Sequence, residues 1–396
     1  MISDYDAIPM LMQPRYVRGE RGLDGKFGKS PMVKTLLDAI ALTLNAGIDM
    51  IMTPGGLHAG PSFKAQLAAA KACVSGKEPR VPMARLDDAV RRILKVKYAM
   101  GLVEALPAGQ TILDPASFDG CLGCSEHRAI ARRAVSQSAV LLVNRDNILP
   151  LALTADASGG GAARPHLYVT GRGADHLGMQ CGGWSYDWQG VASEKKRFTT
   201  GVTLWQGLTA QLANGSATHV SDVTNAAAWV QSMESNRAAR GASPGVSPSH
   251  VTLTVPSADA AKPIVLVVTG EKPYAEGGGD TRNPHLDFDD EALIHSLHHV
   301  GARVILVLYS GRPLLISNHI LEQLDGFVAA WLPGTEAGDG LADVLLGKVG
   351  FSGLSSFGWP KSTVQLGRQP PDSELLFPRG AGIKTAAHPA APAEVM

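Results

Sequence analysis

The chain has 396 residues, enough for two or three domains, and 45% of them are hydrophobic, so a large core can be buried. Its 36 basic and 36 acidic side chains balance. This balance argues against nucleic acid or a membrane surface as a partner held by bulk electrostatics. No uninterrupted apolar run reaches the roughly 18 residues of a membrane-spanning helix, so no such helix is expected.

Residues 1–102 predict short strands alternating with helices, a pattern that indicates a parallel sheet. The apolar spacing predicts helices over Ser30–Leu44, Ser62–Val74 and Leu86–Tyr98, and a short buried strand over Ile48–Met52. The apolar face of the third helix consists of Leu86, Val90, Ile93, Leu94 and Tyr98. Gly101 is expected to end this helix.

Residues 103–125 are interpreted as a linker because Pro107 and Pro115 interrupt any periodic pattern. Cys121 and Cys124 have the spacing of a metal or redox pair. No second pair accompanies them, so a chance pair in a linker is favoured over a zinc site, and no metal is predicted.

Residues 126–383 predict a second α/β domain. It begins with a helix over Glu126–Gln137 and continues with strands over 138–143, 166–170, 264–268, 304–308 and 327–331, and a helix over 338–346. The last three strands are almost continuously apolar, which is typical of the centre of a parallel sheet. The stretch Ala238–Val251 is interpreted as a loose insertion, and Lys384–Met396 as a disordered tail.

The loop after strand 264–268 carries Glu271, Glu276 and three consecutive glycines. Ligands of open α/β sheets bind outside the carboxyl ends of the strands, so this loop is a candidate site for a reacting carboxylic acid. The alternative is a solvated loop with surface acids. Trp184 follows two glycines and is a candidate platform for a sugar ring, the alternative being a core tryptophan. Asp4 is either a catalytic acid or a frayed terminal one.

Ordered motifs from residue 2 to about residue 383 resemble glycoside hydrolase family 3, of the β-glucosidase and exo-glucanase type. They are ISDYD at Ile2, NAGIDMIM at Asn45, LDDAVRRILKVKYAMGL at Leu86, EHRAIARRAV at Glu126, QCGGWSYDWQG at Gln180, GEKPYAEGGGD at Gly270, YSGRPLLI at Tyr309 and AAWLPGTEAGDGLADVLLG at Ala329. The resemblance implies that residues 1–102 are the C-terminal remnant of a (β/α)8 barrel, followed by an α/β sandwich domain with a mainly parallel sheet.

The resemblance also implies the roles of single residues. Asp4 matches the nucleophile and Glu276 the acid/base of a retaining mechanism without metal or cofactor, and Trp184 matches an indole that stacks on the sugar beyond the cleaved bond. Tyr5 stands where relatives usually have tryptophan. Glu271 competes with Glu276 for the acid role, but it directly follows the strand and is expected to be a structural or sugar-contacting acid.

The function implied is hydrolysis of terminal β-D-glucosyl residues from β-glucosides or β-glucans. A complete barrel takes about 250 residues, and family members hold the sugar mostly through earlier barrel strands, so we expect this chain to be part of a longer or split protein, with a separate barrel fragment as a partner in the split case. The alternative is an inactive remnant that binds carbohydrate weakly. Relatives are commonly exported, whereas Met1-Ile2-Ser3-Asp4 lacks the basic region of a signal peptide, so the compartment stays open.

Overall fold

The computed structural model divides into two compact units, Met1–Asp119 and Gly120–Met396, which are described separately. The residues that it describes are 1–12, 33–53, 62–75, 79–102, 123–155, 166–192, 198, 200–212, 217–239, 251–254, 262–368 and 370–388. Most of the linker expected over 103–125, and the centre of the insertion expected over Ala238–Val251, lie outside these residues. Among the described helices, none is both long and apolar enough to cross a membrane.

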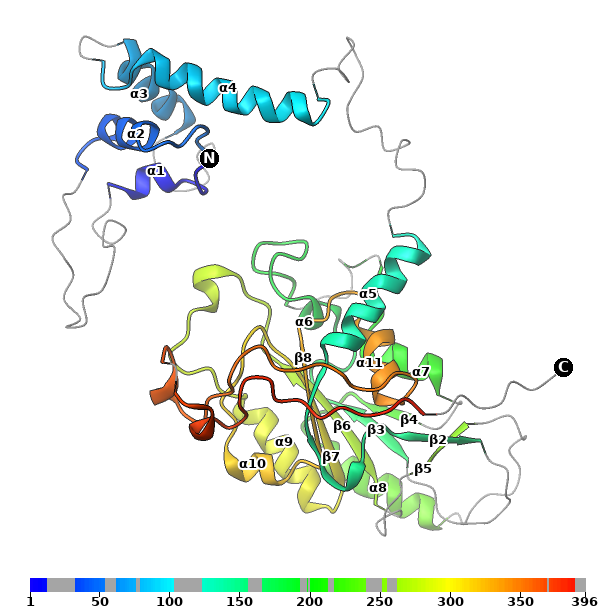
Figure 1. Cartoon of the computed structure of the whole chain (residues 1–396). Helices are drawn as coiled ribbons and strands as arrows, with labels where there is room; N and C mark the ends of the chain where they lie inside the picture. The colour runs from blue at the N-terminus through cyan, green and yellow to red at the C-terminus, as the bar shows by residue number, and fades with distance from the viewer. Residues whose placement is uncertain are drawn as a thin grey trace. The chain divides into compact units, whose positions relative to one another are not determined.

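The described part of the first unit consists mainly of helices α1 (Ala7–Met10), α2 (Leu36–Asn45), α3 (Phe63–Ser75) and α4 (Met83–Ala99) (Figure 1). Its core is formed by Ile8, Ala39, Ile40, Ala41, Leu44, Cys73 and Val81. The α2 helix begins where the side chain of Thr35 accepts a hydrogen bond from the backbone of Asp38. Gly101 has φ of +70° directly after α4, as expected of a residue that ends a helix.

Two expectations for this unit are wrong. The predicted strand Ile48–Met52 is reduced to one isolated parallel bridge between Ile2 and Met50, and Met50 and Met52 are 40% and 45% exposed. A strand needs neighbours on its edges and cover on its faces, and the described residues supply a single bridging partner. The predicted helix Ser30–Leu44 starts only at Leu36, because Thr35 is extended. The (β/α)8 remnant therefore stays a prediction.

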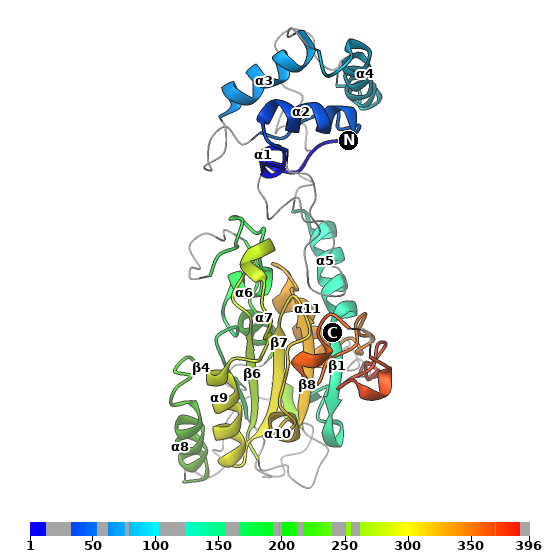
Figure 2. The same cartoon turned by 90° about the vertical axis from the view of Figure 1, so that its left-hand side faces the viewer.

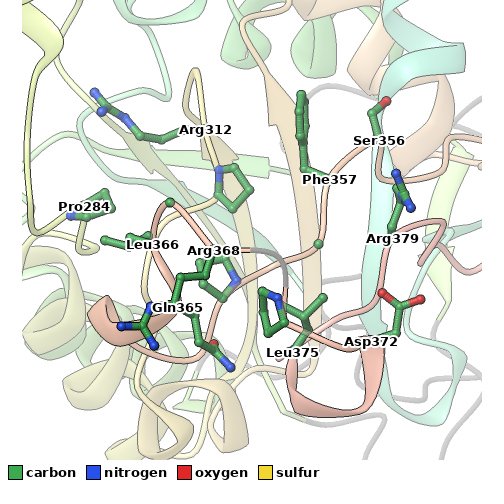
Figure 3. Close-up of a pocket in the computed structure, with 15 residues that line it drawn as sticks. Pro284, Arg312, Ser356, Phe357, Gln365, Leu366, Arg368, Asp372, Leu375 and Arg379 are labelled. Atoms are coloured by element: carbon green, nitrogen blue, oxygen red, sulfur yellow. The ribbon is translucent and has the colours of Figure 1, made fainter. Parts of the chain in front are cut away.

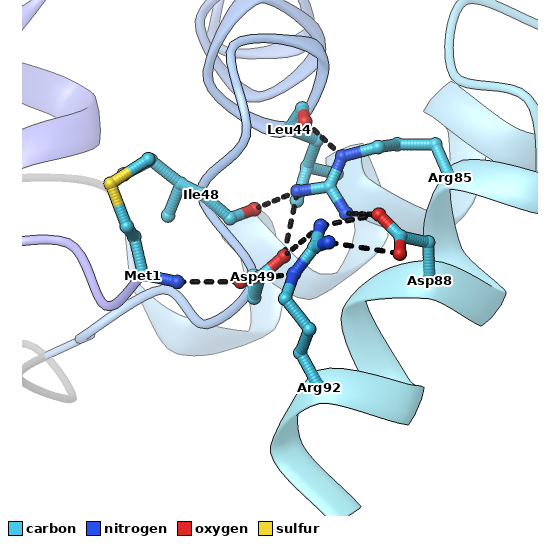
Figure 4. A network of polar contacts seen from close by, with 7 residues as sticks. All are labelled: Met1, Leu44, Ile48, Asp49, Arg85, Asp88 and Arg92. Carbon is cyan, nitrogen blue, oxygen red and sulfur yellow. Dashed lines mark hydrogen bonds and ion pairs between the residues drawn. The ribbon is translucent and has the colours of Figure 1, made fainter. Parts of the chain in front are cut away.

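Asp49 joins several segments of the first unit through ion pairs (Figure 4). Its carboxylate contacts Arg85 Nη2 at 2.9 Å, Arg92 Nε at 3.0 Å and the Met1 ammonium at 2.5 Å, and its side chain is 4% exposed. Arg85 also donates to the carbonyl oxygens of Leu44 and Ile48 at the end of α2. The hydrogen bond from Arg92 is the largest influence that holds the pKa of Asp49 far below its usual range.

The second unit is built on a six-stranded sheet in the order β1-β8-β7-β6-β3-β4. The strands are β1 (Val140–Asn144), β3 (Leu167–Thr170), β4 (Ala217–Val220), β6 (Ile264–Gly270), β7 (Arg303–Tyr309) and β8 (Gly326–Trp331). All neighbours pair in parallel except β1, which runs antiparallel to β8 at one edge. The predicted mainly parallel sheet, with strands 264–268, 304–308 and 327–331 away from its edges, is confirmed.

Helices cover both faces of this sheet (Figures 1 and 2). One core cluster packs α5 (Ser125–Ser138), α7 (Leu204–Gln211) and α11 (Ala337–Leu345) against one face. The other cluster packs α8 (Ala226–Ala239), α9 (Phe288–His299) and α10 (Asn318–Glu322) against the opposite face. The short helix α6 (Leu177–Cys181) follows β3, and a separate ribbon pairs β2 (Ala152–Ala155) with β5 (Val251–Thr254). All seven residues of β6 and of β7 are buried, as two covered faces require.

The end of the described chain packs on the second unit. Ile383 N donates to Leu141 O at 2.8 Å, and His388 N donates to Gly347 O at 2.8 Å. The disordered tail expected over Lys384–Met396 is therefore wrong for residues 384–388, whose backbone finds partners despite the low-complexity composition. Residues 389–396 lie outside the described part of the chain.

Candidate active site

The loops that follow the parallel strands meet at the carboxyl edge of the sheet. The ladder between β6 and β7 continues into this edge, where Glu271 N donates to Tyr309 O at 2.9 Å. The ladder between β7 and β8 continues likewise, with Ser310 N donating to Trp331 O at 3.0 Å. The acidic loop predicted from the sequence thus begins on a rigid element.

Glu271 is tied to two neighbours at this edge. One carboxylate oxygen accepts a hydrogen bond from the Tyr274 hydroxyl at 2.8 Å, and the other lies 3.0 Å from Arg312 Nε. The Arg312 guanidinium also lies over the Tyr274 ring, 4.4 Å from its centroid. Burial, followed by the hydrogen bond to Glu271, raises the pKa of Tyr274 to about 12. Glu271 is therefore held in a structural cluster.

Gln189 anchors the middle of the acidic loop. Its side-chain amide accepts from Ala275 N at 2.9 Å and donates to Ala275 O at 3.0 Å, which satisfies both backbone groups of that residue. A Cβ built on Gly278 would lie 2.3 Å from Gln189 Oε1. Only glycine lets the backbone of the acidic loop come this close to the Gln189 amide. The loop containing Gln189 and the acidic loop thus pack against each other.

Glu276, the next residue of the acidic loop, has an exposed side chain. Its φ is +50°, a left-handed conformation that is uncommon outside glycine. One carboxylate oxygen, Oε2, accepts a hydrogen bond from the indole Nε1 of Trp188 at 3.2 Å. The backbone turns the carboxylate outward and the indole holds it there, so Glu276 can meet a ligand while Glu271 is occupied.

Trp184 lies on the same surface and is 70% exposed, which excludes the alternative of a core tryptophan. It has φ of +59°, and its N–H donates to Trp188 O at 3.0 Å. The preceding Gly183 packs so closely that an added Cβ would lie 2.0 Å from Tyr274 O. Gly183 therefore brings the backbone before the indole against the acidic loop, and the indole is exposed, as the sequence pattern suggested.

A cavity of about 420 Å³ lies beside Glu271 and is also lined by Lys272, Tyr274 and Arg312. Glu276 and Trp184 do not line it. The exposed acid and indole stand on open surface, where a sugar ring could stack without entering an enclosed pocket.

Asp4 and Tyr5 belong to the first unit, and both are exposed. The Asp4 carboxylate accepts a hydrogen bond from the backbone of Tyr5 at 2.7 Å, and Asp4 O accepts from Ala7 N at 3.3 Å. Ser3 N pairs with Met50 O at 2.9 Å, so Asp4 lies just after the bridge between Ile2 and Met50.

Sequence reasoning missed three residues of this edge: Trp188, Gln189 and Arg312. The motif WQG beside CGGW was a distinctive signal, but it did not reveal that its tryptophan and glutamine contact the acidic loop. No group of three or more potential metal ligands gathers anywhere in the described ranges.

Comparison with protein families matches residues 139–385 to the glycosyl hydrolase family 3 C-terminal domain. The chain is 31% identical to the lysosomal β-glucosidase of Dictyostelium discoideum over 83% of this chain and 36% of that protein. It is 29% identical to the periplasmic β-glucosidase of Salmonella typhimurium over 83% of this chain and 40% of that protein.

Among solved structures, the exo-1,3/1,4-β-glucanase from a Pseudoalteromonas species superposes with a TM-score of 0.65 at 31% identity, covering 87% of this chain and 38% of that one. The β-glucosidase from Listeria innocua, at 23% identity, shares the fold with a TM-score of 0.64 over 88% of this chain and 44% of that one. The chain thus spans less than half the length of the relatives it matches.

Proposed function

Because the chain belongs to glycoside hydrolase family 3, we propose that it forms part of a retaining glycosidase that removes terminal β-D-glucosyl residues from β-glucosides or β-glucans. The observation that supports this most directly is the exposed Glu276 carboxylate, held by the Trp188 indole beside the exposed Trp184. The relatives, which are named as β-glucosidases and an exo-glucanase, agree with this substrate class.

The proposed mechanism uses two carboxyl groups. The ionised carboxylate of Asp4 attacks the anomeric carbon, while Glu276 protonates the departing glycosidic oxygen as the bond breaks. Glu276, then ionised, takes a proton from water that releases the sugar from Asp4 with its configuration retained. This chemistry needs the two groups about 5–5.5 Å apart. It therefore requires Asp4 and Glu276 to come together in the active protein.

The local contacts support Glu276 over Glu271 as the acid. Glu271 is already engaged by both the Tyr274 hydroxyl and the Arg312 guanidinium. A general acid must bring a proton to the leaving group, so an exposed carboxyl held by a single indole N–H suits the task better. Trp184 is proposed to stack on the sugar beyond the cleaved bond, and Tyr5 and Glu271 to line the site.

Leaving-group dependence tests this assignment in a preparation that hydrolyses β-glucosides, made from the chain alone or joined to the further segment that its relatives possess. Glu276→Gln should slow hydrolysis of alkyl glucosides by about 10²–10⁴-fold, but that of activated aryl glucosides far less, because a good leaving group departs without a proton. Azide should partly restore the variant on activated substrates and yield the β-glycosyl azide.

Two matched variants separate the roles. Asp4→Asn should remove activity on both substrate types, since no glycosyl-enzyme forms, and an added small anion could give only the α-product. If Glu271→Gln instead shows the leaving-group dependence and the azide rescue, and Glu276→Gln shows neither, the acid has been assigned to the wrong residue.

A further inference from the structure

A groove of about 420 Å³ lies in the second unit between the loop after β7 and the C-terminal segment 356–379 (Figure 3). Sites for small molecules in proteins typically measure about 300–1,000 Å³. Arg312 and Pro284 line both this groove and the cavity beside Glu271, so the two border one another. Neither Glu276 nor Trp184 lines the groove, and the proposed hydrolysis makes no use of it.

The fully buried Trp359 anchors the chain between Gly358 and Pro360, which both line the groove. Its indole Nε1 donates to Leu314 O at 2.6 Å, and its backbone pairs with the segment around Phe377. Gln365 holds the lining segment around it in place, because its side chain accepts a hydrogen bond from Lys361 N at 2.6 Å and donates one to Glu374 O at 2.9 Å. The groove is therefore formed before any ligand binds, which reduces the entropy lost on binding.

Charge is distributed unevenly along the lining, which includes Arg312, Arg368, Arg379 and Asp372. Arg312 is neutralised by Glu271. The guanidinium groups of Arg368 and Arg379 are exposed and form no ion pair or side-chain hydrogen bond with any residue in the described part of the chain. Asp372 offsets one of these two charges, so the described lining residues retain the equivalent of one uncompensated positive charge.

An apolar surface accompanies the free cations. The Phe357 ring is 65% exposed and in Figure 3 stands between Arg312 and Arg379. The apolar lining also includes Leu366, Leu375 and several prolines. An exposed aromatic face on a preformed groove suits a flat ligand with apolar C–H groups, such as a pyranose ring. A planar guanidinium pairs best with a planar carboxylate through two parallel hydrogen bonds.

We propose that this groove binds a carboxylate-bearing sugar, a uronic acid residue, with its ring on Phe357 and its carboxylate on Arg368 or Arg379. A single negative charge matches the one positive charge left uncompensated among the described lining residues. The site lies beside the proposed active site and goes beyond the proposed function, since binding here requires neither Asp4 nor Glu276.

Titration of the 396-residue chain with methyl β-D-glucuronide, followed calorimetrically and by saturation-transfer NMR, tests the proposal. Binding should be detectable and should weaken as salt is raised from about 0.05 to 0.5 M, because screening acts on exposed charges. Arg368→Gln or Arg379→Gln should weaken it about tenfold or more. Phe357→Ala should also weaken it, but should leave the salt dependence in place.

Controls distinguish the groove from other sites. Arg133→Gln removes an exposed arginine of α5 that does not line the groove, and it should leave the affinity within about twofold. Glu276→Gln should also leave glucuronide binding unchanged, so failure of the proposed hydrolysis would not affect this result. Absence of glucuronide binding, equally tight binding of acetate, or equal loss in Arg133→Gln would each overturn the proposal. So would binding of methyl β-D-glucoside that is equally tight and equally sensitive to the arginine variants.

Discussion

The indole Nε1 of Trp188 donates a hydrogen bond to Oε2 of Glu276 across 3.2 Å, although 88 residues separate them in sequence. The side chain of the next residue, Gln189, forms hydrogen bonds with both the N–H and the carbonyl of Ala275, which directly precedes Glu276. The position of the proposed acid is thus determined by a loop that follows a different strand of the sheet. This dependence leads to the first two predictions.

Trp188→Phe should lower kcat/KM for alkyl β-glucosides about three- to tenfold in an active preparation, because the lost hydrogen bond is worth about 0.5–1.5 kcal/mol. The effect should fall mainly on kcat and be smaller for activated aryl glucosides, which need no proton. Trp205→Phe, on α7 and stacked on His219 with ring centroids 5.2 Å apart, is the matched control. Equal losses in both variants would show a general packing effect instead.

Gln189→Glu should lower the free energy of unfolding of the second unit by about 1–3 kcal/mol, as measured by urea denaturation. Glutamate keeps the acceptor for Ala275 N but loses the donor to Ala275 O and places a charge against that carbonyl. The same change at Gln231, which is exposed on α8, should cost less than about 0.5 kcal/mol. A neutral outcome at Gln189 would mean that the acidic loop is held by other contacts.

The 396-residue chain by itself should hydrolyse aryl β-glucosides at well below the usual enzyme range of about 1–10³ s⁻¹. The relatives it matches are more than twice as long, and the family resemblance implies that most sugar contacts at the cleavage subsite come from earlier barrel strands. Assaying a full-length relative in parallel provides the control. Turnover comparable to that relative would contradict the expectation.

Acid should destabilise the first unit through Asp49. The ion pairs hold its pKa in the folded unit far below the value of about 3.9 expected when unfolded. The stabilisation is therefore fully present above about pH 4 and is lost as the pH falls below it. Hydrogen exchange of α4 peptides should accelerate over that range.

Asp49→Asn should remove this dependence and speed exchange of α4 already at neutral pH, because Arg85 and Arg92 lose their shared partner. Asp87→Asn changes an exposed acid of the same helix and should behave like the unmodified chain. Exchange that accelerates equally with acid in all three proteins would assign the effect to other groups.

The central strands of the second unit could be predicted because burial on both faces leaves a plain signal: β6 and β7 are apolar along nearly their whole length. The edge strand β4 and the ribbon of β2 and β5 were not predicted. The same reasoning failed at Ile48–Met52, where a similar apolar run has one bridging partner and stays partly exposed. The helix over Leu86–Tyr98 was located correctly as α4, yet Val90 and Tyr98 on its apolar face are 51% and 57% exposed. Periodicity indicates the type of an element but does not show what covers it.

For the candidate site, the sequence indicated the exposed indole and the acidic loop, because their glycines and acids are local signals. The pairing of Gln189 with Ala275 and of Arg312 with Glu271 joins residues on different strand-end loops. Such contacts depend on strand order, which a single sequence does not contain. The roles of Asp4 and Glu276 stay predictions.

Trp359 is completely buried, whereas Trp184 is 70% exposed. This contrast can be used in fluorescence quenching measurements. Collisional quenchers such as acrylamide reach an indole in water readily and a buried one hardly at all. Sugar stacked on Trp184 should shield it and reduce the quenchable fraction of the emission, whereas Trp359 should keep reporting the integrity of the sheet. Occupancy of the exposed surface and intactness of the fold can therefore be followed in one cuvette without any label.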